Sequence, residues 1–165
     1  MAVTTQKTTE YGNATAAPAV NNSPAEMGGR LRIAYGVHDQ SGAGDATSSV
    51  ALFRLPAGRV RVLLGLSFFY VNWTTASATL DLGWDAYTKL DGSTQAADPD
   101  GLVDGLDVDT AGKYSGADLV SALTQSAGGT QVFESKDGIV IRATSQDVAL
   151  ADGSDIAGYI VYVVD

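Results

Sequence analysis

From residue 30 onward, apolar and polar residues alternate with a period of two, the pattern of β-strands that bury one face. Residues 30–37 (RLRIAYGV) and 49–55 (SVALFRL) each predict a strand, and residues 59–73 (RVRVLLGLSFFYVNW) predict one long strand. In the first strand the apolar positions are Leu31, Ile33, Tyr35 and Val37. In the long strand the residues expected to share one face are Val60, Val62, Leu64, Leu66, Phe68 and Tyr70. The second half of the long strand is apolar on both faces, so we expect it to meet another surface.

Further strands are predicted in the second half of the chain. Residues 77–87 alternate again, with Leu80, Leu82 and Trp84 expected inside and Asp81, Gly83 and Asp85 outside. Residues 130–135 and 138–144 predict a hairpin, because Asp-Gly between them is a strong turn signal. Residues 158–165 are apolar on both faces, which predicts a central strand covered on each side. Residues 116–125 fit either a short helix or an edge strand.

Short strands separated by turns, with little helix between them, predict an all-β fold. We expect a β-sandwich of the jelly-roll type, formed by residues 30–165 as a single domain. No internal repeat is apparent in the sequence, which argues against a propeller or a solenoid.

Residues 1–29 differ from the rest of the chain, since they are rich in Thr, Ala and Asn and hold few large apolar side chains. Such a segment buries too little surface to offset its conformational entropy, so we expect a flexible or extended N-terminal arm. It is either a disordered tail or an arm that becomes ordered against a neighbouring subunit. In the second case its anchors would be Tyr11, Val20 and Met27.

Composition excludes several classes of function. The chain has no cysteine and one histidine, His38, so disulfides, thiolate metal sites and multi-histidine sites within one subunit are ruled out. The net charge of −9 argues against a nucleic-acid partner, because phosphate binding needs Lys and Arg. No apolar run approaches the roughly 18 residues of a membrane span, and the N-terminus lacks the apolar core of a signal peptide. We therefore expect neither a membrane nor a nucleic-acid partner.

Residues 97–112 (ADPDGLVDGLDVDTAG) hold five aspartates at short spacing. They are Asp98, Asp100, Asp104, Asp107 and Asp109. An EF-hand loop starting at Asp98 would need a ligand where the chain has Leu102 and a glycine where it has Val103, so the template fails. A looser calcium site from Asp98 and Asp100 stays open, although we predict no metal or cofactor. We expect a structured connection whose Leu and Val residues lie under the sandwich and whose aspartates face outward.

Catalytic patterns are also missing from the sequence. The aspartates carry no mark of a buried acid and base pair, no G-x-S-x-G motif accompanies His38, and no Gly-rich stretch is followed by the Lys-Ser/Thr of a P-loop. Trp73, Trp84 and Tyr87 would suit a sugar-binding platform, although the spacing of Trp84 also fits a core position. We therefore expect a protein that is not an enzyme.

The charges are unevenly distributed along the chain. Five of the ten basic residues fall in the first three predicted strands, whereas Asp81 to Asp109 contains eight aspartates and one lysine. We infer that subunits meet with acidic loops against arginine strands, because arginine binds carboxylates in a bidentate manner. The predicted interface residues are Tyr11, Val20, Met27, Arg30, Arg32, Arg59, Arg61, Phe69, Trp73, Asp98, Asp100, Asp107 and Asp109.

Between Ser49 and Asp165 the order of segments is "LFRLPAGRVRVLLGLSF", "TLDLGWDAY", "DPDGLVDGLDVDTAG" and a closing "GYIVYVVD". This order resembles small virion structural proteins of tailed bacteriophages, of the capsid decoration or cement type. The resemblance implies a β-sandwich or jelly-roll body that forms a homotrimer on the outer surface of the virion capsid. Its partner would be the major capsid protein, whose subunits it would bridge.

The alternative is a carbohydrate- or receptor-binding β-sandwich of a phage tail, neck or fibre. Exposed Trp73, Trp84 and Tyr87 would support that alternative.

Overall fold

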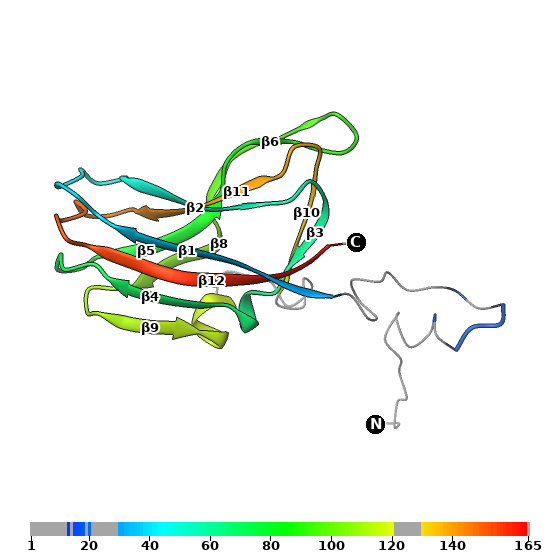
Figure 1. The fold of residues 1–165 in the computed structure, drawn as a ribbon, viewed down its shortest axis with the longest axis horizontal. Coiled ribbons are helices and arrows are strands. Elements are labelled where there is room, and N and C mark those ends of the chain that lie inside the picture. Colours follow the sequence, from blue (N-terminus) through cyan, green and yellow to red (C-terminus); the bar gives the residue numbers. More distant parts are fainter. Residues whose placement is uncertain (1–12, 14, 19, 21–29, 121–129, 165) are drawn as a thin grey trace, which may run out of the picture.

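The computed structural model describes residues 13, 15–18, 20, 30–120 and 130–164 and shows a sandwich of two antiparallel sheets (Figure 1). The six-stranded sheet contains β1 (Leu31–Asp39), β3 (Gly58–Val62), β4 (Phe68–Asn72), β9 (Gly112–Ser115), β10 (Gln131–Ser135) and β12 (Asp155–Val164). The four-stranded sheet has the order β2 (Ser49–Leu55), β11 (Ile139–Ser145), β5 (Thr79–Trp84) and β8 (Asp98–Asp107). The short strands β6 (Tyr87–Thr88) and β7 (Thr94–Gln95) form a separate ribbon. The predicted all-β sandwich is confirmed.

Strand β12 is the centre of the six-stranded sheet. It pairs with β1 along its length, from Leu31 opposite Val163 to Asp39 opposite Asp155. Its other edge is shared by β3 and β4, which lie end to end along it. The central position predicted for the closing strand is confirmed. The prediction that it is covered on each side is confirmed in part: Ile160 on the core side and Val161 and Val163 on the opposite side are all buried, whereas Tyr159 is only half-buried.

The long strand predicted for residues 59–73 is broken in two. The 3₁₀ turn η1 (Leu64–Leu66) separates β3 from β4. The Ser67 hydroxyl fixes this break, since it donates to the Leu63 carbonyl at 3.1 Å and accepts from the Val161 amide at 3.0 Å. After the break the other set of alternate residues faces the core. Phe69 is therefore buried, whereas its neighbour Phe68 points outward.

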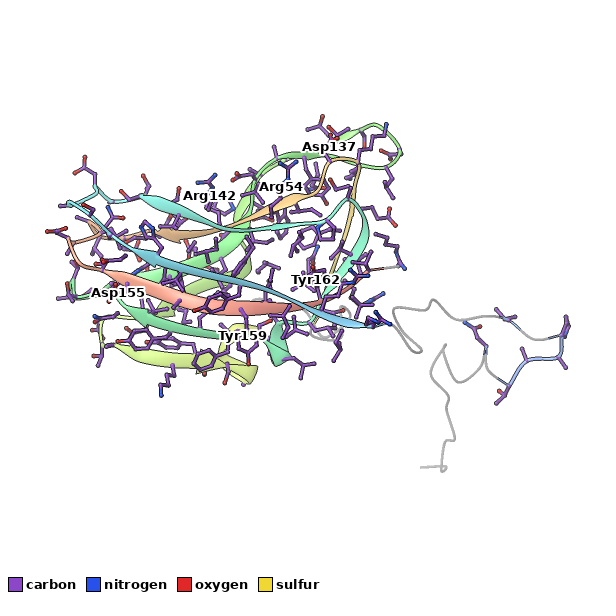
Figure 2. The ribbon with its side chains drawn as sticks, viewed as in Figure 1. Arg54, Asp137, Arg142, Asp155, Tyr159 and Tyr162 are labelled. Atoms are coloured by element: carbon purple, nitrogen blue, oxygen red, sulfur yellow. The ribbon has the colours of Figure 1, made fainter. Side chains whose placement is uncertain are left out.

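The prediction that residues 130–135 and 138–144 pair as a hairpin around Asp137-Gly138 is also wrong. The turn is present, but β10 pairs with β3 and β11 pairs with β2 and β5, so the chain passes from one sheet to the other. Arg54 holds this corner by donating from Nη2 to the Asp137 carbonyl at 2.6 Å (Figure 2). Gly138 has φ +91°, and a Cβ there would lie 2.5 Å from the Leu55 carbonyl oxygen, so the corner requires glycine.

The core lies between the inner faces of the two sheets. Its largest fully buried side chains are Trp73, Phe69, Phe133, Leu55, Leu64, Leu80, Leu82, Leu102, Leu119, Ile139, Ile141 and Ile156. The predicted inward orientation of Leu80, Leu82 and Trp84 is confirmed. Residues 116–120, left open between helix and strand, form the 3₁₀ turn η2 (Gly116–Val120), and residues 121–125 lie outside the described residues.

The acidic stretch forms strand β8 on the edge of the four-stranded sheet, paired with β5 through two register shifts. Leu102, Val103 and Val108 are fully buried, whereas Asp100, Asp104, Asp107 and Asp109 are exposed. The expected arrangement of buried apolar residues under outward aspartates is confirmed. Close approach of the two strands depends on Gly83, because a Cβ there would lie 1.9 Å from the Asp98 carbonyl oxygen.

Candidate partner-binding face

The outer side of the six-stranded sheet carries a row of exposed apolar side chains on β1. Leu31, Ile33, Tyr35 and Val37 are exposed by 57%, 63%, 69% and 64%. These alternate positions point away from the core, and their spacing places them in one line along the strand. Single exposed apolar residues are ordinary on protein surfaces, whereas a continuous row of four is typical of an interaction surface.

Local sequence explains why these residues point outward. The alternate positions of β1 include Ala34 and Gly36, and a Cβ at Gly36 would lie 2.9 Å from the Leu52 carbonyl oxygen and 3.1 Å from the Phe53 ring. The space between β1 and β2 therefore admits only small residues. The larger apolar residues of β1 must face the other way.

The apolar row continues onto β12 and β4. Tyr35 lies opposite Tyr159 in the β1–β12 register, and Tyr159 lies opposite Phe68 in the β12–β4 register. The rings of Phe68 and Tyr159 stack, with centroids 5.9 Å apart. Figure 2 places Tyr159 on the strand that runs beside β1. We call the outward residues of these three strands the outer apolar face; they are Leu31, Ile33, Tyr35, Val37, Ala157, Tyr159, Phe68 and Tyr70, and Val161 and Val163, which point to the same side, are buried.

The two ends of this face carry opposite charges. At one end Asp39 of β1 lies directly opposite Asp155 of β12, and in the described part of the chain neither forms an ion pair. At the other end Arg30 and Arg32 are exposed, but the alternation of β1 places them on the side of Ala34 and Gly36, opposite to this face. Arg61 of β3 lies opposite Val163 at this same end and donates to the Thr130 hydroxyl at 3.2 Å.

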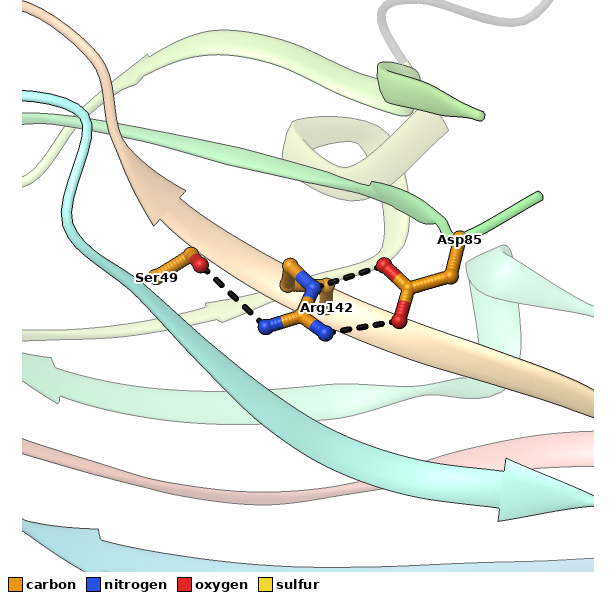
Figure 3. A network of polar contacts seen from close by, with 3 residues as sticks. All are labelled: Ser49, Asp85 and Arg142. Carbon is orange, nitrogen blue, oxygen red and sulfur yellow. Dashed lines mark hydrogen bonds and ion pairs between the residues drawn. The ribbon is translucent and has the colours of Figure 1, made fainter. Parts of the chain in front are cut away.

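The outer side of the four-stranded sheet is polar by contrast. Arg142 of β11 donates from Nε and Nη2 to the two carboxylate oxygens of Asp85 at 2.7 and 2.6 Å, and from Nη1 to the Ser49 hydroxyl at 3.2 Å (Figure 3). The hydrogen bonds from Arg142 lower the pKa of Asp85, and the positive charge of Arg142 acts in the same direction. Burial of Asp85 opposes them but is the smaller effect. The network lines a shallow hollow of about 310 Å³, to which Thr144 and Gln146 also contribute.

On β8 the neighbouring aspartates Asp98 and Asp100 contact each other. A hydrogen bond with Asp100 raises the pKa of Asp98, and burial acts in the same direction. Asp81, on the neighbouring strand, is buried and accepts a hydrogen bond from the Gly105 amide at 2.7 Å. Burial raises the pKa of Asp81 more than this hydrogen bond lowers it. Within the described residues, none of the β8 aspartates forms an ion pair with an arginine of the same chain.

Several predicted interface residues lie elsewhere than expected. Phe69 and Trp73 are 0% and 2% exposed, so placing them on a partner surface was wrong. Both lie on the inward side of the sheet because η1 shifts the alternation by one residue. Tyr11 and Met27 lie outside the described residues, and Val20 is 49% exposed.

The four predicted arginines lie at one end of the six-stranded sheet. Arg30 and Arg32 are at the start of β1; Arg59, which pairs with Glu134 at 3.3 Å, and Arg61 are on β3. The sequence pattern alone did not identify the β1 row as a surface. Its available signal was the small residues Ala34 and Gly36 between the large apolar ones.

Among residues 30–120 and 130–164 no three metal-ligating side chains gather into a candidate site. In the same part of the chain no helix has the length and apolar character to span a bilayer.

The fold resembles viral capsid proteins of known structure. A chain of the cyanophage Pam1 capsid asymmetric unit matches with a TM-score of 0.53 and 15% identity, over 92% of this chain and 97% of that chain. The VP2 subviral particle of infectious bursal disease virus gives a TM-score of 0.42 and 10% identity, over 84% of this chain and 33% of that chain. No family model and no curated protein sequence matches this chain. At 15% identity, the likeness to the Pam1 chain shows a shared fold.

Proposed function

We propose that this chain is a non-enzymatic capsid decoration, or cement, protein of a phage. It binds the outer surface of the assembled head shell through the major capsid protein and stabilises the shell by bridging capsid subunits. The observation that carries the proposal is the outer apolar face, because a sandwich that exposes four apolar side chains in line is suited to an assembly.

The comparison of folds supports the same proposal. The Pam1 chain belongs to a capsid asymmetric unit, and it matches over 97% of its own length, so a protein of nearly this size and fold is a capsid component there. The resemblance of residues 49–165 to decoration proteins points in the same direction.

The alternative, a carbohydrate- or receptor-binding sandwich, has less support. Its expected aromatic platform needed Trp73 and Trp84 at the surface, and they are 2% and 7% exposed. Tyr87 remains partly exposed, in a hollow of about 250 Å³ shared with Lys89 and Glu134. A glycan array with and without calcium tests this alternative, and binding there without binding to shells would favour it.

The test of the proposal uses virions from which the gene of this chain has been deleted. Purified full-length protein is added back, the particles are sedimented, and the temperature at which they release DNA is measured. We expect the protein to sediment with the shells in a fixed ratio and to raise the release temperature. Protein that stays in the supernatant with intact shells would overturn the proposal.

The role of residues 1–29 stays a prediction. Deletion of residues 1–28 is expected to weaken sedimentation with the shells if this segment lies on the shell or clasps a neighbouring subunit. Undiminished binding of the shortened chain would show that the segment is not needed for attachment.

A further inference from the structure

We propose that the hollow between edge strand β10 and the β6–β7 ribbon binds one small uncharged sugar ring. The hollow measures about 250 Å³, and the ribbon that covers it stands beside the end of β10 (Figure 1). The inference goes beyond the proposed function and does not depend on attachment to a shell.

The ribbon is fixed to the body of the sandwich at both of its ends. Before the ribbon, the indole Nε1 of Trp84 donates to the carbonyl of Ala96, which follows β7, at 3.2 Å. After β10, the amide of Lys136 donates to the carbonyl of Thr88 in β6 at 2.9 Å. The hollow is therefore formed before a ligand arrives, so binding requires little ordering of the chain.

One wall of the hollow is aromatic. The half-buried ring of Tyr87 packs on Phe133 with ring centroids 6.1 Å apart and an interplanar angle of 71°. The Tyr87 hydroxyl is hydrogen-bonded to the backbone of Glu134, which also holds the ring in place. Because the face of an aromatic ring carries partial negative charge, it attracts the weakly positive C–H groups of a sugar.

Two glutamine amides supply the hydrogen-bonding groups of the hollow. Gln95 of β7 is half-buried, and among the described residues no hydrogen bond engages its side chain. Gln131 of β10 donates only one long bond, to the Val132 carbonyl at 3.4 Å. Each amide can both donate and accept, and so can each hydroxyl of a sugar. The pair of amides therefore matches the hydroxyl groups of such a ring.

Charge and size narrow the class of ligand. Lys89 and Glu134 bring opposite charges to the hollow, and Glu134 is already paired with Arg59 at 3.3 Å. The local charge is thus balanced, and the net charge of −9 repels anions such as phosphate esters. Pockets for drug-sized ligands begin at about 300 Å³, so this smaller hollow suits a single ring. An uncharged monosaccharide meets all of these conditions.

The experiment is an NMR titration of the ¹⁵N-labelled full chain with glucose, galactose and N-acetylglucosamine, each added separately. We expect saturable shifts of the Gln95 and Gln131 side-chain amides with at least one sugar. The dissociation constant should be millimolar, because a ligand of about twelve heavy atoms gains little binding energy. Glucose 6-phosphate should bind more weakly than glucose, and equal binding would contradict the preference for an uncharged ring.

Two matched variants locate the site. Gln95→Ala is expected to raise the dissociation constant by about fivefold to tenfold, because it removes hydrogen bonds to the ligand. Gln146→Ala is the control, since Gln146 is an exposed glutamine that lines the other hollow, beside Arg142.

The inference would be overturned if none of the three sugars produced saturable shifts, or if Gln95→Ala and Gln146→Ala bound sugar equally well. Circular dichroism establishes that each variant is folded. Sedimentation with shells is measured separately and reports on the proposed function alone, so the two proposals can fail independently.

Discussion

The two outer surfaces of this sandwich are built from the same kind of strand but meet their surroundings differently. On β11 the outward position is taken by Arg142, whose guanidinium is satisfied by Asp85 and Ser49. On β1 the outward positions are apolar, and no described element packs over them. The polar surface is thus complete within one chain, whereas the apolar surface leaves area exposed to water that a partner would cover.

The difference shows how one sandwich can separate the residues that fold it from those that bind a partner. Both sheets bury their inner faces in one shared core, so the fold does not need the outer side of β1. That side is free to carry residues chosen for a contact with another protein. The predictions below test this separation between folding and binding, from the largest expected effect to the smallest.

The sharpest test of the separation uses two neighbouring phenylalanines on β4. Phe69→Ala removes a fully buried ring that packs on Phe53, and we expect a loss of about 3–5 kcal/mol in the free energy of unfolding. Phe68→Ala removes an outward ring stacked on Tyr159, and we expect a loss of about 1 kcal/mol. Urea denaturation measures both values. Equal losses would show that the outer ring also supports the fold.

The polar surface is tested by a double-mutant cycle on Arg142→Ala and Asp85→Asn. Both side chains are about one third exposed, at 32% and 37%, so solvent screening limits their coupling to about 1 kcal/mol or less. Because the pKa of Asp85 is lowered on folding, its stabilising effect is present above its ordinary value and disappears as the pH falls through the folded value. The gap in stability between wild type and Asp85→Asn should therefore close in acid. A gap independent of pH would contradict the assignment.

Asp81 is expected to show the opposite pH dependence. Burial raises its pKa, so its favourable contribution is complete below the ordinary value and is lost as the pH rises through the folded value. In Asp81→Asn the amide oxygen still accepts the hydrogen bond of Gly105, and the ionisation is removed. The stability of Asp81→Asn relative to wild type should increase from about pH 3 to pH 7. Thermal unfolding at several pH values measures it, and a decrease would contradict the sign.

The smallest effect on folding is expected from Ile33→Asp and Ala51→Asp, one exposed position on each outer surface. Both should change the free energy of unfolding by no more than about 0.5 kcal/mol. They should differ in the binding of a hydrophobic dye, which we expect to fall for Ile33→Asp alone, because Ala51 lies on the polar surface. Equal dye binding by the two variants would remove the contrast between the surfaces.

The sequence predicts the positions of strands well because the alternation is local. It predicts the two-sheet sandwich, the inward side of Leu80 to Trp84 and the buried Leu and Val residues under the β8 aspartates. It fails where pairing over long range decides the outcome. The Asp137-Gly138 turn joins two sheets instead of a hairpin, and the turn at η1 reverses the side on which Phe69 lies.

The candidate face could be predicted only in part for a related reason. Alternation shows that Leu31 to Val37 share one side of a strand, but it does not show whether that side is inside. The answer depends on how closely β2 approaches Gly36, which is a property of the assembled sandwich. The arginines at the end of the six-stranded sheet were identified from their distribution along the chain, whereas the apolar row was missed.

The central claim is that the outer apolar face contacts another protein in the assembled particle. A density map of the virion at side-chain resolution, with this chain located, tests it most directly. The account predicts that Leu31, Ile33, Tyr35 and Val37 are covered by a neighbouring chain. A map in which this row faces solvent, with the chain attached through another surface, would contradict it.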